Sequence, residues 1–118
     1  MPFYPAAMMR PAQIRLQFLV VLWREFRVVW PVVSGLFAMQ LLLGFLIGRF
    51  EEWRIGDAIY FTFVTGLTVG YGDVVPLRFI SRALSVIIAL IGILLTAMMA
   101  AVAVRALQEA TKSDGDTR

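Results

Sequence analysis

The 118-residue sequence contains no cysteine and no histidine. Without cysteine the chain has no disulfide, thiolate nucleophile or cysteine metal site, and without histidine it has no imidazole ligand or imidazole acid–base group. Charged residues are also scarce, at 16%, whereas hydrophobic residues make up 60%. A soluble domain contains about 25% charged residues. We therefore expect a single-domain membrane protein over residues 1–118 that is not an enzyme and whose apolar surface is covered by lipid and other subunits.

The basic residues do not indicate nucleic-acid binding. The formal net charge is only +3, and the 11 basic residues, all arginine except Lys112, are spread along the chain. Basic residues that bracket apolar stretches are typical of membrane proteins, in which they set the orientation. We expect no nucleic-acid partner.

Two long uncharged stretches cover residues 28–48 and 83–104, with 21 and 22 residues. At about 1.5 Å per residue, each reaches about 30 Å, the thickness of the hydrocarbon core. These stretches predict an outer transmembrane helix over 28–48 and an inner one over 82–105. Residues 1–27 form a cytoplasmic or interfacial segment, in which Pro11 to Arg27 is either an amphipathic surface helix or an extension of the outer helix. The polar residues 111–118 predict a disordered cytoplasmic tail.

A third uncharged stretch runs from Ala58 to Gly72 and is too short, at 15 residues, to cross a membrane. It predicts a re-entrant loop: a half-helix from Ala58 to Leu67 with Asp57 as its N-cap, then extended chain. If Asp57 is only a loop residue, the re-entrant interpretation is unchanged. Non-helical backbone at membrane depth is tolerated only where it is buried in protein or faces water. The loop therefore predicts a pore or cavity.

The distribution of basic residues predicts the orientation. Seven flank the two termini and four lie in the central segment between the spans. By the positive-inside rule, both termini are cytoplasmic and the loop enters from the outer face. We expect a multi-pass protein of the cell membrane, either the plasma membrane or a bacterial inner membrane.

The sequence Thr68-Val69-Gly70-Tyr71-Gly72-Asp73 ends the re-entrant stretch. It resembles the selectivity-filter signature of potassium channels, and the order helix, pore loop, helix resembles the two-transmembrane potassium channels of bacterial type. The resemblance implies an all-α membrane protein with an outer helix, a pore helix and extended filter over 57–73, and an inner helix. It also implies a homotetrameric pore for passive K⁺ conduction, with no cofactor besides the permeant ions.

The resemblance places K⁺ at the backbone carbonyls of Thr68, Val69, Gly70 and Tyr71, with the Thr68 hydroxyl at the inner end and Gly72 completing the filter. Carbonyl rings replace the hydration shell of the ion without a charge that would trap it. An ordinary strand points successive carbonyls to opposite sides, so we expect Gly70 and Gly72 to supply unusual dihedrals. Related non-selective channels carry an acidic residue at the position of Tyr71, so this tyrosine favours potassium selectivity.

Three residues are expected to support the filter: Tyr60, Val64 and Asp73. In the potassium-channel pattern, Tyr60 and Phe61 stand where two tryptophans are common, and Val64 replaces a glutamate of some bacterial members. Val64 cannot share a proton with Asp73, but the Tyr60 hydroxyl can reach that carboxylate instead. We therefore hypothesise that filter inactivation differs from that of members with the glutamate.

The second span carries the expected cavity and gate. Gly92 is interpreted as a hinge or, alternatively, as a site of close helix packing. Ile93, Thr96 and Ala100 share a helical face and are expected to line the cavity, with Val104 near an inner constriction; Thr96 can instead bond to its own helix. Gly44 and Gly48 form a GxxxG pattern that we expect to pack the outer helix on the inner one.

Two other functions fit the same sequence. One is a weakly selective cation channel that shares the filter sequence. The other is a non-conducting membrane interaction protein or regulatory subunit. The intact run from Thr68 to Asp73 favours conduction over the non-conducting alternative.

Overall fold

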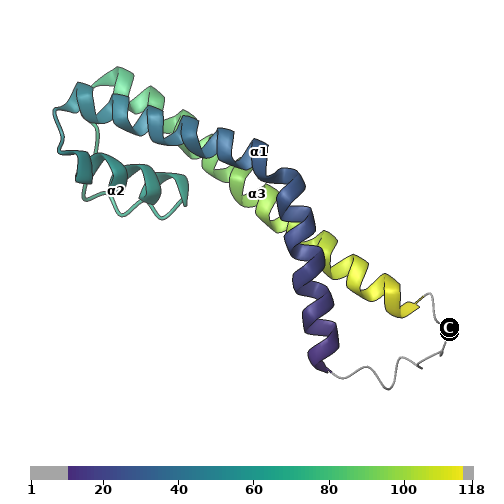
Figure 1. The fold of residues 1–118 in the computed structure, drawn as a ribbon. Coiled ribbons are helices and arrows are strands. Elements are labelled where there is room, and N and C mark those ends of the chain that lie inside the picture. Colours follow the sequence, from purple (N-terminus) through teal and green to yellow (C-terminus); the bar gives the residue numbers. More distant parts are fainter. Residues whose placement is uncertain (1–10, 116–118) are drawn as a thin grey trace. The chain divides into compact units, whose positions relative to one another are not determined.

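The computed structural model describes residues 11–115, and these residues form three helices. They are α1 (Pro11–Glu51), α2 (Ile55–Gly66) and α3 (Phe79–Gly115), shown in Figure 1. The two helices long and apolar enough to cross a membrane are α1 and, over Phe79–Lys112, α3. The predicted order of long helix, short helix, glycine-rich segment and long helix is confirmed.

Helix α1 extends beyond the predicted outer span at both ends. Its 41 residues include Pro31 and reach about 60 Å at 1.5 Å per residue, about twice the thickness of the hydrocarbon core. The helix is longer than the predicted span because charged residues end an apolar stretch without ending a helix. The backbone of Pro11 to Arg27 is thus a continuation of the outer helix, while residues 1–10 of the predicted N-terminal segment lie outside the described residues.

Helix α3 also extends past both ends of its predicted span. It begins at Phe79 and continues to Gly115, so the prediction of a disordered tail from residue 111 is wrong for 111–115. The segment around Arg105 contains alanine, leucine, glutamine and glutamate, which favour helix and carry it past the charge. Residues 116–118 of the predicted tail lie outside the described residues.

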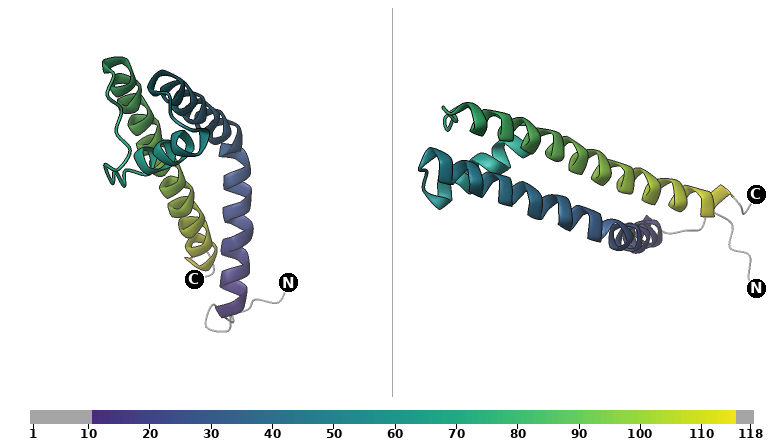
Figure 2. Two further views of the ribbon diagram at one scale, coloured as in Figure 1. Left: turned by 90° about the vertical axis from the view of Figure 1, so that its left-hand side faces the viewer. Right: turned by 90° about the horizontal axis from the view of Figure 1, so that it is seen from above.

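The chain divides into two compact units, one of residues 32–98 and one that combines residues up to Pro31 with those from Met99 onward. In the 32–98 unit, Figure 2 shows α2 lying between α1 and α3. Its core consists of the buried side chains of Ile47, Phe61 and Ile88. Trp53 packs edge-on against Phe61, with ring centroids 5.2 Å apart. One residue from each helix therefore meets in this core, which fixes α2 beside both long helices.

Small residues bring α1 and α2 into close contact. A β-carbon at Gly48 would lie 2.7 Å from the Ala58 β-carbon, and one at Gly44 would lie 2.9 Å from the Thr62 β-carbon. The expectation that these two glycines pack the outer helix on the inner one is therefore wrong. They pack it on α2, because the short helix occupies the space that the absent side chains leave.

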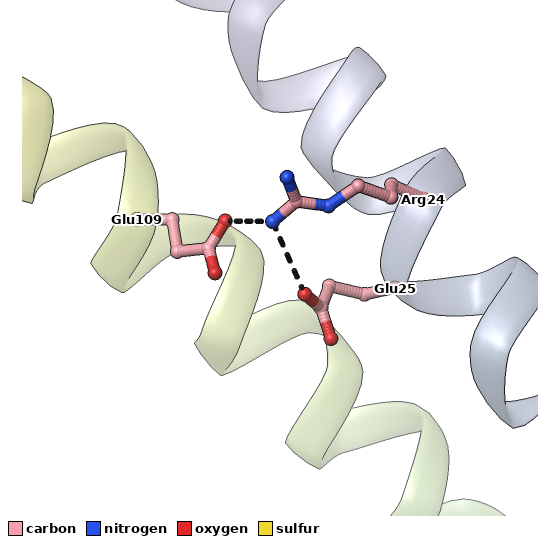
Figure 3. A network of polar contacts seen from close by, with 3 residues as sticks. All are labelled: Arg24, Glu25 and Glu109. Carbon is pink, nitrogen blue, oxygen red and sulfur yellow. Dashed lines mark hydrogen bonds and ion pairs between the residues drawn. The ribbon is translucent and has the colours of Figure 1, made fainter.

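The second unit joins the first and last described segments of the chain. Val102 and Ala106 of α3 are buried in it. Arg24 on α1 donates to the Glu109 carboxylate on α3 across 2.8 Å, and its guanidinium lies 3.6 Å from Glu25 (Figure 3). An ion pair between residues 85 positions apart thus connects α1 and α3 within this unit.

Candidate functional site

The segment from Leu67 to Arg78 connects α2 to α3 and contains the whole Thr68 to Asp73 motif. Its first amides bond back onto α2: Leu67 donates to the Phe63 carbonyl at 2.8 Å and Thr68 to the Thr65 carbonyl at 3.1 Å. The amides of Val69 and Gly70 both donate to the Val64 carbonyl, at 2.9 and 3.1 Å. These bonds satisfy carbonyls that a helix end leaves unpaired. The motif is therefore fixed directly to the end of α2.

Within the motif, every second residue has a positive φ. The angles are 59° at Thr68, 56° at Gly70 and 79° at Gly72. The expectation of unusual dihedrals at the two glycines is confirmed, and the alternation differs from a strand, in which successive carbonyls face opposite sides. Thr68 was not expected to share this conformation, which is disfavoured for a β-branched residue. Its spacing of two from Gly70 is the sequence signal that could have indicated it.

The expected hydrogen bond behind the motif is present. The Tyr60 hydroxyl of α2 donates to Oδ2 of Asp73 across 2.9 Å. Tyr60, Val64 and Asp73 line one hollow of about 260 Å³ together with Gly70 and Gly72. The structure thus brings the three predicted support residues together beside two residues of the motif, with an apolar side chain at position 64.

Glu51, the last residue of α1, was not identified from the sequence. Its carboxylate accepts from the backbone amides of Leu77 at 3.1 Å and Arg78 at 2.8 Å, just before α3 begins. The hydrogen bond from the Arg78 amide lowers the pKa of Glu51, which lies beyond the uncharged stretch 28–48. The Arg82 Nε also donates to the Pro76 carbonyl at 3.1 Å. These contacts fix the chain between the motif and α3, and only the folded backbone brings the partners together.

The prediction of Asp57 as an N-cap is wrong. Helix α2 begins at Ile55, its N-cap is Arg54 without a side-chain cap bond, and the Ala58 amide donates to the Arg54 carbonyl at 3.1 Å. Asp57 lies instead inside the first turn. A carboxylate in the first turn still interacts favourably with the helix dipole. Asp57 was therefore correctly assigned to the start of the helix, but the helix begins at Ile55 and not at Ala58.

On α3, Gly92 is a site of close packing. A β-carbon at this position would overlap the Gly66 carbonyl oxygen and lie 2.6 Å from its carbonyl carbon. The alternative role for Gly92 is therefore present in the structure, whereas bending at Gly92 stays a prediction. The Thr96 hydroxyl donates to the Gly92 carbonyl at 2.9 Å, as the alternative interpretation of that residue expected.

The remaining cavity and gate residues lie on the surface of the single chain. Ile93, Ala100 and Val104 are exposed on α3, and their place along an ion pathway stays a prediction. No cluster of three or more acidic side chains that could hold a metal ion occurs within residues 11–115. That the backbone carbonyls of the motif bind K⁺ stays a prediction.

Comparison with known protein families gives a match over most of the described chain. The sequence model of a family described as "Ion channel" matches residues 31–109, well over half of the chain. The matched region begins within α1 and includes α2, the Thr68 to Asp73 motif and most of α3. No curated protein and no solved structure matches the chain.

Proposed function

Because the chain belongs to the ion channel family, we propose that it forms a potassium-selective channel that conducts K⁺ passively across a membrane. Family membership and the two long apolar helices make it a membrane protein for ion transport, and ion channels are not enzymes. The observation that carries the potassium proposal is the alternation of positive φ at Thr68, Gly70 and Gly72 within the Thr-Val-Gly-Tyr-Gly-Asp sequence.

In the proposed filter, K⁺ passes along the backbone carbonyls of Thr68, Val69, Gly70 and Tyr71, with the Thr68 hydroxyl at the inner end. Each ion leaves water because oxygen atoms replace its hydration shell, and neighbouring sites let ions displace one another. The hydrogen bonds from this segment to the end of α2 and from Tyr60 to Asp73 support the proposal, because a filter must hold its oxygens in place.

We assign the pore to a homotetramer. One chain offers one column of carbonyls, and an ion needs oxygens around it, which cyclic symmetry supplies. The exposure of the motif supports this assembly: Val69 is 49% exposed and Tyr71 is 73% exposed in the single chain. Apolar side chains next to an ion pathway need covering, and three further copies cover them.

The membrane orientation follows from charge. Seven basic residues flank the termini and four lie between the spans, so both termini are placed in the cytoplasm of a cell whose plasma or inner membrane the channel crosses. The proposed pathway uses backbone oxygens and needs no cofactor other than the permeant ions, and no nucleic-acid partner is proposed.

Flux from the purified protein in liposomes tests this function. Vesicles loaded with K⁺ and placed in a K⁺-poor medium should release K⁺, barium should block the release, and replacing K⁺ by Na⁺ should suppress it. Gly70→Ala is the control variant, because a side chain at a φ of 56° strains the filter. Equal K⁺ and Na⁺ flux would favour the weakly selective channel, and absence of flux would favour the non-conducting subunit.

A further inference from the structure

The last residue of α2 is held from two sides without a side chain of its own. Gly66 lies against the Gln40 carboxamide of α1, and a β-carbon at position 66 would lie 2.9 Å from the Gln40 Cδ. On α3, Gly92 lies against the Gly66 carbonyl group. Gly66 is two residues before Thr68, the first residue of the motif. Only Leu67 separates Gly66 from the candidate filter in the sequence.

The contact with Gln40 is one layer of a regular series between α1 and α2. Gln40, Gly44 and Gly48 of α1 lie against Gly66, Thr62 and Ala58 of α2, in that order. Both helices step by four residues, in opposite directions, so the layers follow the rows of side chains that lie along a helix face. In two layers α1 supplies the glycine and α2 the small side chain. The layer nearest the motif is reversed, and there Gln40 fills the space.

We propose that Gln40 is a positioning residue for the filter: its side chain, seated on Gly66, sets the position of the last turn of α2 and so of Thr68. This inference rests on the proposed potassium filter. Gln40 touches no ion and acts through Gly66. A change at position 40 therefore alters how well the filter oxygens fit K⁺.

Gln40 positions α2 by contact and not by a hydrogen bond. Its side chain is buried, with the residue only 6% exposed, in a stretch of α1 without charged residues. Across residues 11–115, its carboxamide makes no hydrogen bond. The length and shape of the side chain therefore carry the effect. An unbranched apolar side chain of similar length satisfies the same contact.

The test measures how far K⁺ raises the melting temperature of the protein, with Na⁺ keeping the ionic strength constant. The half-protecting concentration is the K⁺ concentration that gives half of the largest rise. Binding to the folded state raises stability according to ligand concentration and affinity. We expect Gln40→Ala to raise this concentration about tenfold, the change produced by about 1.4 kcal/mol of binding free energy. Gln40→Met should remain within about threefold of the unsubstituted protein, a difference below that same 1.4 kcal/mol.

Two further variants complete the design. Leu42→Ala removes an exposed side chain of the same helix, and it should leave the half-protecting concentration unchanged. Gln40→Asn shortens the side chain by one methylene and serves if Gln40→Ala does not assemble; it should give an intermediate value. A merely structural role for Gln40 would lower thermal stability equally in K⁺ and Na⁺.

The outcomes separate this inference from the function on which it rests. K⁺ protection that is the same in the unsubstituted protein, Gln40→Ala and Gln40→Asn overturns the inference and leaves the proposed function standing. A Gln40→Met variant as impaired as Gln40→Ala overturns the contact role. Absence of K⁺ protection in the unsubstituted protein overturns the proposed function together with the inference.

Discussion

The Tyr60 hydroxyl is the side-chain donor that holds Asp73, the last residue of the motif. The two groups lie 2.9 Å apart and come from opposite ends of the segment that leads from α2 through the motif. Their hydrogen bond closes this segment behind Gly70 and Gly72. Tyr60 is 39% exposed in the single chain, so water competes with the bond, and its contribution is moderate.

Tyr60→Phe removes this bond and keeps the aromatic ring. Loss of the bond should give about a fivefold faster loss of conducting filters, seen as faster decay of current during sustained activation. Asp73→Ala provides the matched comparison, because it removes the acceptor of the same hydrogen bond, so the effects of the two changes should not add. Fully additive effects would show that the bond does not stabilise the filter.

Val64 gives the hollow behind the motif an apolar wall. Val64→Glu adds a carboxyl group beside Asp73, where it competes with Tyr60 for hydrogen bonding. We expect the rate of current decay to change by about twofold to tenfold, consistent with one hydrogen bond of about 0.5–1.5 kcal/mol. Val64→Leu is the control for volume. Unchanged decay in Val64→Glu recordings would refute the hypothesis that residue 64 sets inactivation.

Gly92→Ala separates close packing from bending. An added β-carbon meets the Gly66 backbone, which cannot give way as a flexible side chain can, and overpacking costs about 1–3 kcal/mol. Thermal stability of the variant should therefore fall. Gly35→Ala is the matched control, because nothing lies within 4 Å of a β-carbon there, and it should be neutral or stabilising. Unchanged stability with altered opening would instead favour the hinge.

The sequence predicted the roles of residues that depend on the local backbone. It did not predict the roles of residues that depend on a partner far away in the sequence. The dihedrals of Gly70 and Gly72 and the bond from Tyr60 to Asp73 follow from a short motif. Glu51 accepts from amides 26 and 27 residues away, and that pairing needs the folded chain. Gln40 looks like an isolated polar residue until Gly66 is placed against it.

The helices show the same division at the scale of elements. The lengths of the two uncharged stretches predicted both spans, because the thickness of the bilayer sets the length of a transmembrane helix. These lengths did not predict the ends of α1 and α3, since helical backbone continues wherever residues favour helix, irrespective of charge. The partner of the Gly44 and Gly48 pattern was also missed. A small-residue stripe shows that another backbone approaches but not which one, and α2 is that partner.

Charge reversal at Arg24 and Glu109 tests whether their ion pair stabilises the contact between α1 and α3. Both side chains are substantially exposed, at 65% and 43%, so the pair contributes about 0.2–1 kcal/mol. Arg24→Glu should lower thermal stability by a similar amount, because it faces Glu109 and Glu25. The charge-swapped double variant, Arg24→Glu with Glu109→Arg, should recover much of the loss at low salt.

High salt provides the internal control for this pair, because screening weakens exposed ion pairs. The difference between single and double variants should shrink as salt is raised. Equal stability of the single and double variants at low salt would show that the two side chains do not interact in the membrane-embedded protein.

At the scale of the whole molecule, the single chain leaves a large apolar surface uncovered. Val69, Tyr71 and Leu67 are exposed around the motif, and large apolar side chains are exposed along both long helices. Lipid suits the surfaces of the long helices, but a segment of irregular backbone at membrane depth must be covered by protein or face water. The tetramer that we propose would satisfy this requirement and would supply the four carbonyl columns of the proposed filter.

The reversal potential of currents through the purified protein, in bilayers with K⁺ on one side and Na⁺ on the other, tests the central claim most directly. A filter built from the carbonyls of Thr68 to Tyr71 predicts a reversal potential close to the K⁺ equilibrium potential and reversing in sign with the gradient. A reversal potential that stays near zero when the two cations are exchanged would contradict potassium selectivity.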